Sequence, residues 1–338
     1  MSTPAFEWSK TKPENEAATG QFASDVRNGL AKPQKELHSK YLYDELGSSL
    51  FEAITHLPEY GLTRADERLL RWNARHIASL LPSSVAVIEL GSGVGQKTRH
   101  LLEAMAALRV PAARAIQPAA PLRYYPIDVS ADALARCEGD LSGFAEVHPL
   151  VQSYLDGMAS ATAQRQPGES FLILFLGSTI GNFERKCAME FLRDLRRALL
   201  PGDLLLLGAD LVKETGRMLE AYDDPTGVTA AFNLNLLGRM NRELGADFRL
   251  RDFEHQARWN ERERRIEMHL RSRLDQTAFI AEAGLSVNFQ AGETIWTESS
   301  HKFRLPELDE LAELAGFSIA GQWVDRDWPF AENLWTVH

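Results

Sequence analysis

The chain has few cysteines, no long apolar run and no excess of basic residues, and each absence excludes a class of protein. Only Cys137 and Cys187 occur among 338 residues, without a CxxC pair, which argues against a disulfide framework and a thiolate metal site. The longest apolar runs fall far short of the roughly 20 residues that a membrane helix needs. Lys and Arg number 37 against 47 Asp and Glu, and this charge of −10 disfavours nucleic acid and membrane surfaces as partners.

Signals for export and for metal binding are also missing. The N-terminus shows no basic stretch followed by an apolar stretch and a small-residue cleavage site, so we expect a cytoplasmic protein. The nine histidines include no HxH or HExxH spacing, so we expect no metal. With 44% apolar and 25% charged residues, the chain has an ordinary globular composition, and its length suggests about two domains.

Short apolar strands alternate with helical patterns through much of the chain. We expect strands at 85–90, 123–129, 170–176 and 204–209, and helices at 66–81, from 132, 188–199 and 308–316. This alternation predicts an α/β fold with a mostly parallel sheet that is covered on both faces. Two last strands, 317–324 and 333–337, should form an antiparallel pair. The segments 110–122 and 158–169 are expected to be surface loops, and residues 212–301 an inserted region.

A glycine cluster, Glu89-Leu90-Gly91-Ser92-Gly93-Val94-Gly95, follows the first expected strand. A phosphate-binding loop is disfavoured because Gln96 replaces the glycine before Lys97. A dinucleotide site is disfavoured because the glycine spacing is G-x-G-x-G and the next strand-end carboxylate, Asp128, comes late. An adenosylmethionine site fits better, with Glu89 near the sulfonium and Asp128 on the ribose hydroxyls. A purely structural turn also remains open.

Several longer motifs then point to one family. They are Leu57-Pro58-Glu59-Tyr60, Phe175-Leu176-Gly177-Ser178-Thr179-Ile180-Gly181-Asn182, Leu207-Gly208-Ala209-Asp210-Leu211-Val212-Lys213, Ala221-Tyr222-Asp223-Asp224, Gly227-Val228-Thr229-Ala230-Ala231-Phe232-Asn233, Arg265-Ile266-Glu267-Met268 and Thr297-Glu298-Ser299-Ser300-His301-Lys302-Phe303. Together these segments resemble the histidine Nα-methyltransferases of ergothioneine biosynthesis, from about Val26 to near the end of the chain.

The resemblance implies a Rossmann-like methyltransferase domain, 65–211 and 302–338, and a substrate-binding domain, 21–64 and 212–301, after a loose segment 1–20. It implies S-adenosylmethionine as cofactor and S-adenosylhomocysteine as product. With the glycine cluster, the expected cofactor residues are Glu89, Gly91, Gly93, Lys97, Asp128, Ser153 and Tyr154. Where the family usually has a Gly-Asp-Phe-like stretch, this chain has Gln152-Ser153-Tyr154. A serine hydroxyl accepts a hydrogen bond from the adenine amino group more weakly than a carboxylate does.

The substrate implied by the resemblance is free L-histidine, methylated three times on its α-amine to hercynine by a protein we expect to be monomeric. Its residues carry onto Tyr60, Gly177, Asn182, Tyr222, Met268, Glu298 and Ser300, with Tyr43 and Tyr60 as candidates to orient the amine or relay its proton. Glu298 and Ser300 lie two apart on an expected strand, so both can face the imidazole. The alternatives are methylation of another amino acid, such as a tryptophan derivative, and a catalytically silent binding protein.

Overall fold

The computed structural model describes residues 13–109 and 121–338, and these form two compact units. The insertion unit comprises the chain up to Leu57, Leu219–Trp259 and Ile266–Glu298. The sheet unit comprises Pro58–Met218, Asn260–Arg265 and Ser299–His338. The chain therefore leaves and re-enters each unit.

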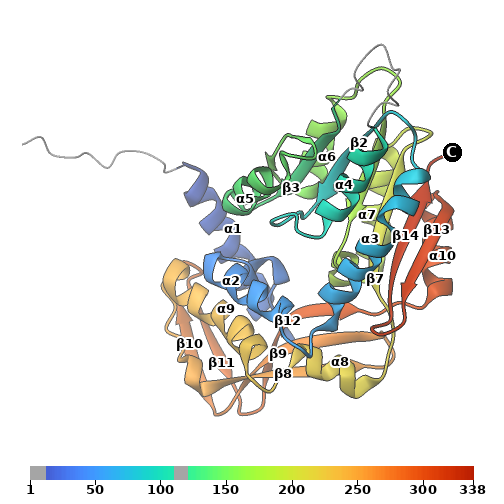
Figure 1. Ribbon diagram of the computed structural model, residues 1–338. Helices are drawn as coiled ribbons and strands as arrows, with labels where there is room; N and C mark the ends of the chain where they lie inside the picture. The colour runs from blue at the N-terminus through green and yellow to red at the C-terminus, as the bar shows by residue number, and fades with distance from the viewer. Residues whose placement is uncertain (1–12, 110–120) are drawn as a thin grey trace, which may run out of the picture. The chain divides into compact units, whose positions relative to one another are not determined.

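The sheet unit is built on an eight-stranded sheet within the described residues. Its order is β13-β14-β7-β6-β2-β3-β4, with β5 also paired to β3, and β14 and β13 form one edge (Figure 1). The strands are β2 (Val85–Leu90), β3 (Arg123–Asp128), β4 (Glu146–Val147), β5 (Leu150–Val151), β6 (Ser170–Phe175), β7 (Leu204–Asp210), β13 (Ser318–Asp325) and β14 (Phe330–Thr336). Strands β3, β2, β6 and β7 run parallel, whereas β14 is antiparallel to both β7 and β13. The predicted α/β fold and final antiparallel pair are confirmed.

Helices cover both faces of this sheet. On one face pack α6 (Tyr154–Thr162), α7 (Arg185–Ala198) and α10 (Leu305–Ala315), and on the other α3 (Gly61–Ser79), α4 (Thr98–Leu108) and α5 (Ala131–Leu141). The inner strands are apolar on both sides; every residue of β2 and β7 is buried. Parallel strands that are buried on both faces consist of continuous apolar runs. This is why the sequence pattern predicted these strands well. A short helix, η2 (Thr179–Asn182), follows β6.

The insertion unit combines helices with a second, smaller sheet. Its elements are α1 (Pro13–Leu30), β1 (Lys35–Glu36), η1 (Ser39–Leu42), α2 (Glu45–Thr55), α8 (Thr215–Tyr222), α9 (Val228–Leu244), η3 (Leu250–Asp252), β8 (Phe253–Asn260), β9 (Arg265–Ser272), β10 (Gln276–Ile280), β11 (Leu285–Phe289) and β12 (Thr294–His301). Four of these elements are shared with the sheet unit, which includes Thr215–Met218 of α8, Asn260 of β8, Arg265 of β9 and Ser299–His301 of β12. The sheet order is β1-β12-β9-β8, and β10 and β11 form a separate antiparallel hairpin. Helix α2 packs on α9.

Two local predictions are wrong. The expected loop 158–169 begins inside helix α6, where Met158 and Ala161 are buried against the sheet. Its small residues suggested a loop, but they let the helix lie close to β3: a Cβ on Gly157 would stand 2.5 Å from Ile127. The expected loose segment 1–20 is helical from Pro13, because a polar composition does not by itself exclude a helix. Residues 1–12 and 110–120 of the expected loose and loop segments lie outside the described residues.

No helix among the described residues is long and apolar enough to cross a membrane.

Candidate functional site

The glycine loop between β2 and α4 has the geometry of a ligand cradle. Gly91, Gly93 and Gly95 all have positive φ, of 73°, 53° and 73°, which a residue with a side chain adopts only at a cost. A Cβ on Gly95 would lie 2.7 Å from Cys137 and Leu141, so this glycine lets the loop pack against α5. A Cβ on Gly93 would meet nothing within 4 Å. The loop thus packs against α5 at Gly95 and has open space beside Gly93.

Asp128, at the end of β3, is tied to this loop. Its Oδ2 accepts a hydrogen bond from the amide of Gly93 at 3.0 Å, and its Oδ1 accepts from the amide of Ser130 at 2.9 Å. Each carboxylate oxygen retains further acceptor capacity, as ribose hydroxyls require. Tyr154 reaches the same place, since a Cβ on Gly91 would stand 3.0 Å from its hydroxyl. Burial and the charge of Asp128 raise the pKa of Tyr154 to about 12, so it stays a neutral hydrogen-bond donor.

Glu89 lies beneath the loop with its carboxyl group turned into the core. Both of its oxygens accept from the hydroxyl of Thr98, at 2.7 and 2.8 Å, and the hydroxyl of Tyr124 also donates to it. Burial raises the pKa of Glu89 to about 7, against the opposite effect of these two donors. These contacts tie Glu89 to the start of α4, and its expected place near the sulfonium stays a prediction.

Ser153 caps the first turn of α6. Its hydroxyl accepts from the amide of Asp156 at 3.4 Å and donates to the carboxylate of Asp156 at 2.6 Å. Both side chains are exposed. The sequence patterns did not predict a role for Asp156, whose carboxylate lies beside Ser153, the residue expected to accept a hydrogen bond from the adenine amino group. The S-x-x-D pattern of a helix N-cap was the available signal.

Lys97 closes the glycine loop and joins it to the loop after β6. Its ammonium group is paired with Asp66, which also accepts a hydrogen bond from the amide of Gly177 at 2.9 Å. The side chain of Lys97 remains 25% exposed, so it can also reach a ligand. Burial opposes its charge, but the neighbouring carboxylate of Asp66 holds the pKa of Lys97 above its ordinary value.

Four expected substrate residues, Tyr60, Gly177, Asn182 and Ser300, lie in the sheet unit. Tyr60 is buried directly before α3, and Asn182 is half-buried at the end of η2. Helix η2 approaches the end of β12, because a Cβ on Gly181 would stand 2.8 Å from the carbonyl oxygen of His301. These elements place Asn182 and Ser300 in neighbouring segments.

A buried ionic cluster holds the hydroxyl of Ser300. Lys302 Nζ donates to Ser300 Oγ at 2.9 Å and lies 2.9 Å from Asp210 Oδ2. Lys213 and the indole nitrogen of Trp328 donate to the other oxygen of Asp210, at 2.7 and 2.9 Å. Although burial opposes ionisation, the two lysines hold the pKa of Asp210 below its ordinary value, so the carboxylate stays charged.

The other expected substrate residues, Tyr222, Met268 and Glu298, lie in the insertion unit, as does Tyr43, a candidate to orient the amine or relay its proton. Tyr43 packs edge-on against Phe51 and Phe232. The side chains of Tyr222, Met268 and Glu298 are buried, with Met268 on β9 and Glu298 on β12. The expected substrate residues are thus divided between the two units.

The backbone of Tyr222 is fixed by a histidine. Nε2 of His255 lies 2.7 Å from the carbonyl oxygen of Tyr222, and its Nδ1 lies 2.9 Å from the amide nitrogen of Asn233. Burial lowers the pKa of His255, which favours the neutral ring. This histidine is therefore a structural support. No group of three His, Cys, Asp or Glu residues suited to a metal ion occurs in the part of the chain that the structure describes.

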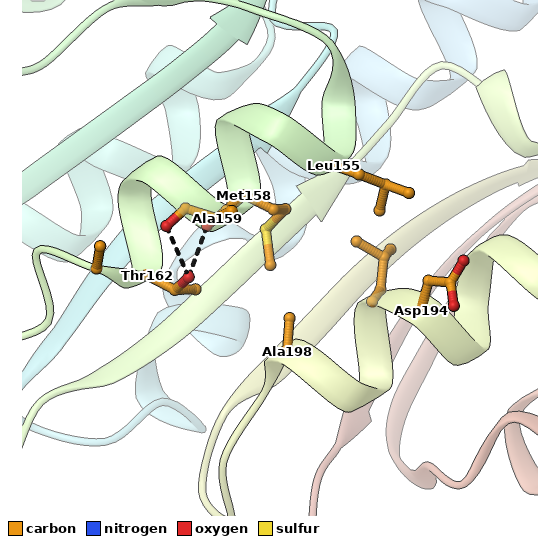
Figure 2. Close-up of a pocket in the computed structure, with 8 residues that line it drawn as sticks. Leu155, Met158, Ala159, Thr162, Asp194 and Ala198 are labelled. Carbon is orange, nitrogen blue, oxygen red and sulfur yellow. Dashed lines mark hydrogen bonds between the residues drawn. The ribbon is translucent and has the colours of Figure 1, made fainter.

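Figure 2 shows a surface hollow between α6 and α7 that contains none of the expected site residues. Leu155, Met158 and Ala198 give it a mainly aliphatic lining. The hydroxyl of Thr162 is bonded to the carbonyl oxygens of its own helix, at 2.8 and 3.2 Å. The hollow offers little polar chemistry, and the glycine loop remains the candidate site.

A parallel α/β sheet with a glycine loop after one strand and a carboxylate at the end of the next defines a class of nucleotide-cofactor enzymes. The open space above Gly93, the acceptor oxygens of Asp128 and the reachable ammonium of Lys97 fit adenosylmethionine, with its ribose and its carboxylate.

Comparison with known proteins identifies the family. The chain matches the model of histidine-specific, SAM-dependent methyltransferases over residues 22–337, and it belongs to this family. It is 44% identical over 322 residues to a histidine N-alpha-methyltransferase of Mycolicibacterium smegmatis, covering 94% of this chain and 96% of the relative. A histidine N-alpha-methyltransferase of Mycobacterium tuberculosis is 40% identical over 317 residues, 92% of this chain and 93% of that one. The family expected from the sequence motifs is confirmed.

A more distant relative has a different substrate in its name. The L-tryptophan methyltransferase of Psilocybe serbica is 28% identical over 338 residues, covering 93% of this chain and 92% of the relative.

Proposed function

We propose that the protein transfers methyl groups from S-adenosylmethionine to the α-amine of L-histidine, three times, and so makes hercynine for ergothioneine biosynthesis. The observation that carries the proposal is the family match over residues 22–337, a range that includes every residue expected to bind the substrate. Monomeric state, cytoplasmic location and independence from metal stay predictions of the sequence.

In the proposed site, Gly91, Gly93, Lys97, Asp128 and Tyr154 bind the cofactor, and Ser153 accepts from the adenine. The cofactor supplies a methyl group that is already activated on a sulfonium, so the chain needs chiefly to align a neutral amine and exclude water. The insertion unit would act as the main part of the substrate-binding domain.

For the amino acid, Asn182 and Tyr222 would hold the α-amine and α-carboxylate, since an amide and a phenol supply the matching donors and acceptors. Glu298 and Ser300 would meet the two imidazole nitrogens, because strand alternation puts both on one face of β12. A site that hydrogen-bonds its ligand rejects analogues without those groups much better than an apolar pocket does. Glu298 and Met268 therefore favour histidine over an indole amino acid.

The two tyrosines proposed to act on the amine can be tested singly. Tyr60 or Tyr43 would orient the amine or pass its proton to water. We expect Tyr60→Phe to lower kcat by roughly tenfold with a smaller change in KM, as befits loss of one proton-transfer or orienting contact. Unchanged turnover and affinity would remove Tyr60 from this role, and Tyr43→Phe is the parallel variant.

The proposed reaction is tested by incubating the protein with adenosylmethionine and a panel of free amino acids that includes histidine and tryptophan, and following added methyl groups by mass spectrometry. We expect trimethylated histidine as the main product. A methylated tryptophan in its place would support the indole alternative. Cofactor binding without any methylated product would contradict the histidine assignment, and loss of cofactor binding as well would favour a silent binding protein.

A further inference from the structure

Four residues from four segments of the sheet unit meet at a point beside the glycine loop. They are Asp66 on α3, Lys97 at the end of the loop, Gly177 after β6 and Glu332 on β14. Asp66 and Glu332 are 0% exposed, so two carboxyl groups are buried together beside one lysine. Burying two carboxyl groups together costs free energy unless hydrogen bonds and opposite charges compensate for the lost contact with water.

Asp66 connects the segment expected to bind cofactor with the segment expected to bind substrate. Its Oδ2 accepts from both Lys97 Nζ and the amide of Gly177. Gly177 has a φ of 69°, and a Cβ there would stand 3.2 Å from Lys97 Nζ. One carboxylate oxygen therefore fixes the lysine and the following loop in a space without room for a side chain.

Glu332 reaches the same point from the neighbouring strands. A Cβ on Gly208 would lie 3.0 Å from Glu332 Oε1 and 3.2 Å from the amide nitrogen of Gly177. Among the described residues, neither oxygen of Glu332 nor Oδ1 of Asp66 has a hydrogen-bond donor. Two such carboxyl groups satisfy each other only when one proton lies between them. Asp66 already accepts from the ammonium of Lys97 and the amide of Gly177, and these contacts favour its ionised form. Glu332 has no such donor in the described part of the chain and is therefore the partner that carries the proton, in agreement with burial and Asp66 raising the pKa of Glu332 well above its ordinary value.

We propose that Glu332 is a neutral carboxylic acid that donates its proton to Asp66, and that this pair positions Lys97 for the cofactor and Gly177 for the amino acid. Asp66 and Glu332 are thus positioning residues for both ligands. The inference rests on the proposed function for its amino-acid half, whereas its cofactor half depends only on the family's use of adenosylmethionine.

Two measurements test the proposal, the Kd for S-adenosylhomocysteine by calorimetry and the kcat/KM for histidine. Asp66→Asn removes the anion that Lys97 and Gly177 share, so both quantities should worsen by about tenfold or more. Glu332→Leu, which takes away the proton donor, should act in the same direction. Glu332→Gln keeps a neutral donor of the same shape, and it should recover both quantities to within about threefold of wild type.

Asp203 provides a matched control in the same unit. It is also a buried carboxylate, but its partners are Arg165 and the amides of Phe171 and Leu200, at the start of β7. Asp203→Asn should lower Tm while leaving the affinity for S-adenosylhomocysteine within about twofold, as expected for a distant, independent site. If the Asp66 and Glu332 variants weakened binding only through a general loss of packing, Asp203→Asn would weaken it as much as they do, and that outcome would overturn the proposal.

The proposal is overturned if Glu332→Gln is as damaging as Glu332→Leu, because an ionised Glu332 would then be required. It is equally overturned if Asp66→Asn binds and turns over like wild type. If Glu332→Leu does not fold, Asp66→Asn and Glu332→Gln decide alone. Should the wild-type protein bind S-adenosylhomocysteine but not methylate histidine, the proposed function fails, and the affinity series still decides the role of the pair.

Discussion

Burial of the carboxyl group of Glu89 should make the stability of the protein depend on pH. Its pKa of about 7 exceeds the ordinary 4.5, so the folded protein retains a proton that the unfolded chain releases. The stabilisation is fully present below pH 4.5 and is lost as pH rises toward 7. Compared with Glu89→Gln, the wild type should lose up to about 3 kcal/mol of unfolding free energy over this window.

Urea unfolding of both proteins between pH 5 and 8 measures this difference. Glu103→Gln, on the exposed side of α4, is the control and should follow the wild-type curve. Parallel curves for wild type and Glu89→Gln would show that Glu89 ionises in the fold as easily as in the unfolded chain.

Ser153 shows how one substitution can be accommodated by a neighbour. Its hydroxyl hydrogen points to Asp156, which leaves the serine oxygen as an acceptor and strengthens it in that role. We expect Ser153→Ala to weaken binding of S-adenosylhomocysteine by roughly three- to tenfold, the value of one hydrogen bond. The double variant Ser153→Asp with Asp156→Asn should bind more tightly than wild type, because an ionised acceptor replaces a neutral one without a second charge beside it.

Calorimetric titration compares these variants, with the melting temperature as a check on the α6 cap. If Ser153→Ala binds S-adenosylhomocysteine like wild type, the adenine amino group has another acceptor.

Elements formed from continuous apolar runs could be predicted closely, and those formed from small or polar residues could not. Strand β2 has the predicted bounds, because a strand buried on both faces shows no polar residue until its end. Helix α6 was missed because Gly157 and its alanines resemble a loop, and only contact with Ile127 explains them.

The same distinction applies to the candidate site. The glycine loop and Asp128 follow from strand ends, whereas Asp66 and Glu332 seemed ordinary acidic residues. Their signal was position: each stands within an apolar pattern, Asp66 beside Leu69 and Leu70 and Glu332 between Phe330 and Leu334. Lys97 is 31 residues from Asp66, and Gly177 is 111 residues from it. A local pattern cannot reveal such contacts.

Two substitutions in the glycine loop should weaken the affinity for S-adenosylhomocysteine for different reasons. In Gly91→Ala the methyl group would press on the Tyr154 hydroxyl, whereas in Gly93→Ala it would enter the open space proposed for the cofactor. Both variants should weaken binding of S-adenosylhomocysteine by about tenfold or more, since each also strains a positive φ. Tyr154→Phe should restore part of the affinity to Gly91→Ala but none to Gly93→Ala.

The affinities of six proteins, the wild type, the three single variants and the two double variants, form two double-mutant cycles that isolate the Gly91 contact. Gly139→Ala is the control: this glycine lies in α5 without positive φ and without a neighbour within 4 Å of its Cβ, so the change should keep affinity and stabilise by up to about 1 kcal/mol. Equal rescue of both loop variants would refute the assigned contact.

All expected cofactor residues lie in the sheet unit, although the chain leaves that unit twice. A bound ligand stabilises the folded state, by about 2.7 kcal/mol at a ligand concentration of 100 Kd, and the segments that contact the ligand are protected most. In the absence of histidine, S-adenosylhomocysteine should therefore slow amide exchange most at 91–97, 128–130 and 153–157. Helix α9, in the insertion unit, serves as the internal comparison and should change little. Hydrogen-exchange mass spectrometry makes the measurement, and protection centred on α9 with an unchanged glycine loop would place the cofactor outside the site assigned to it.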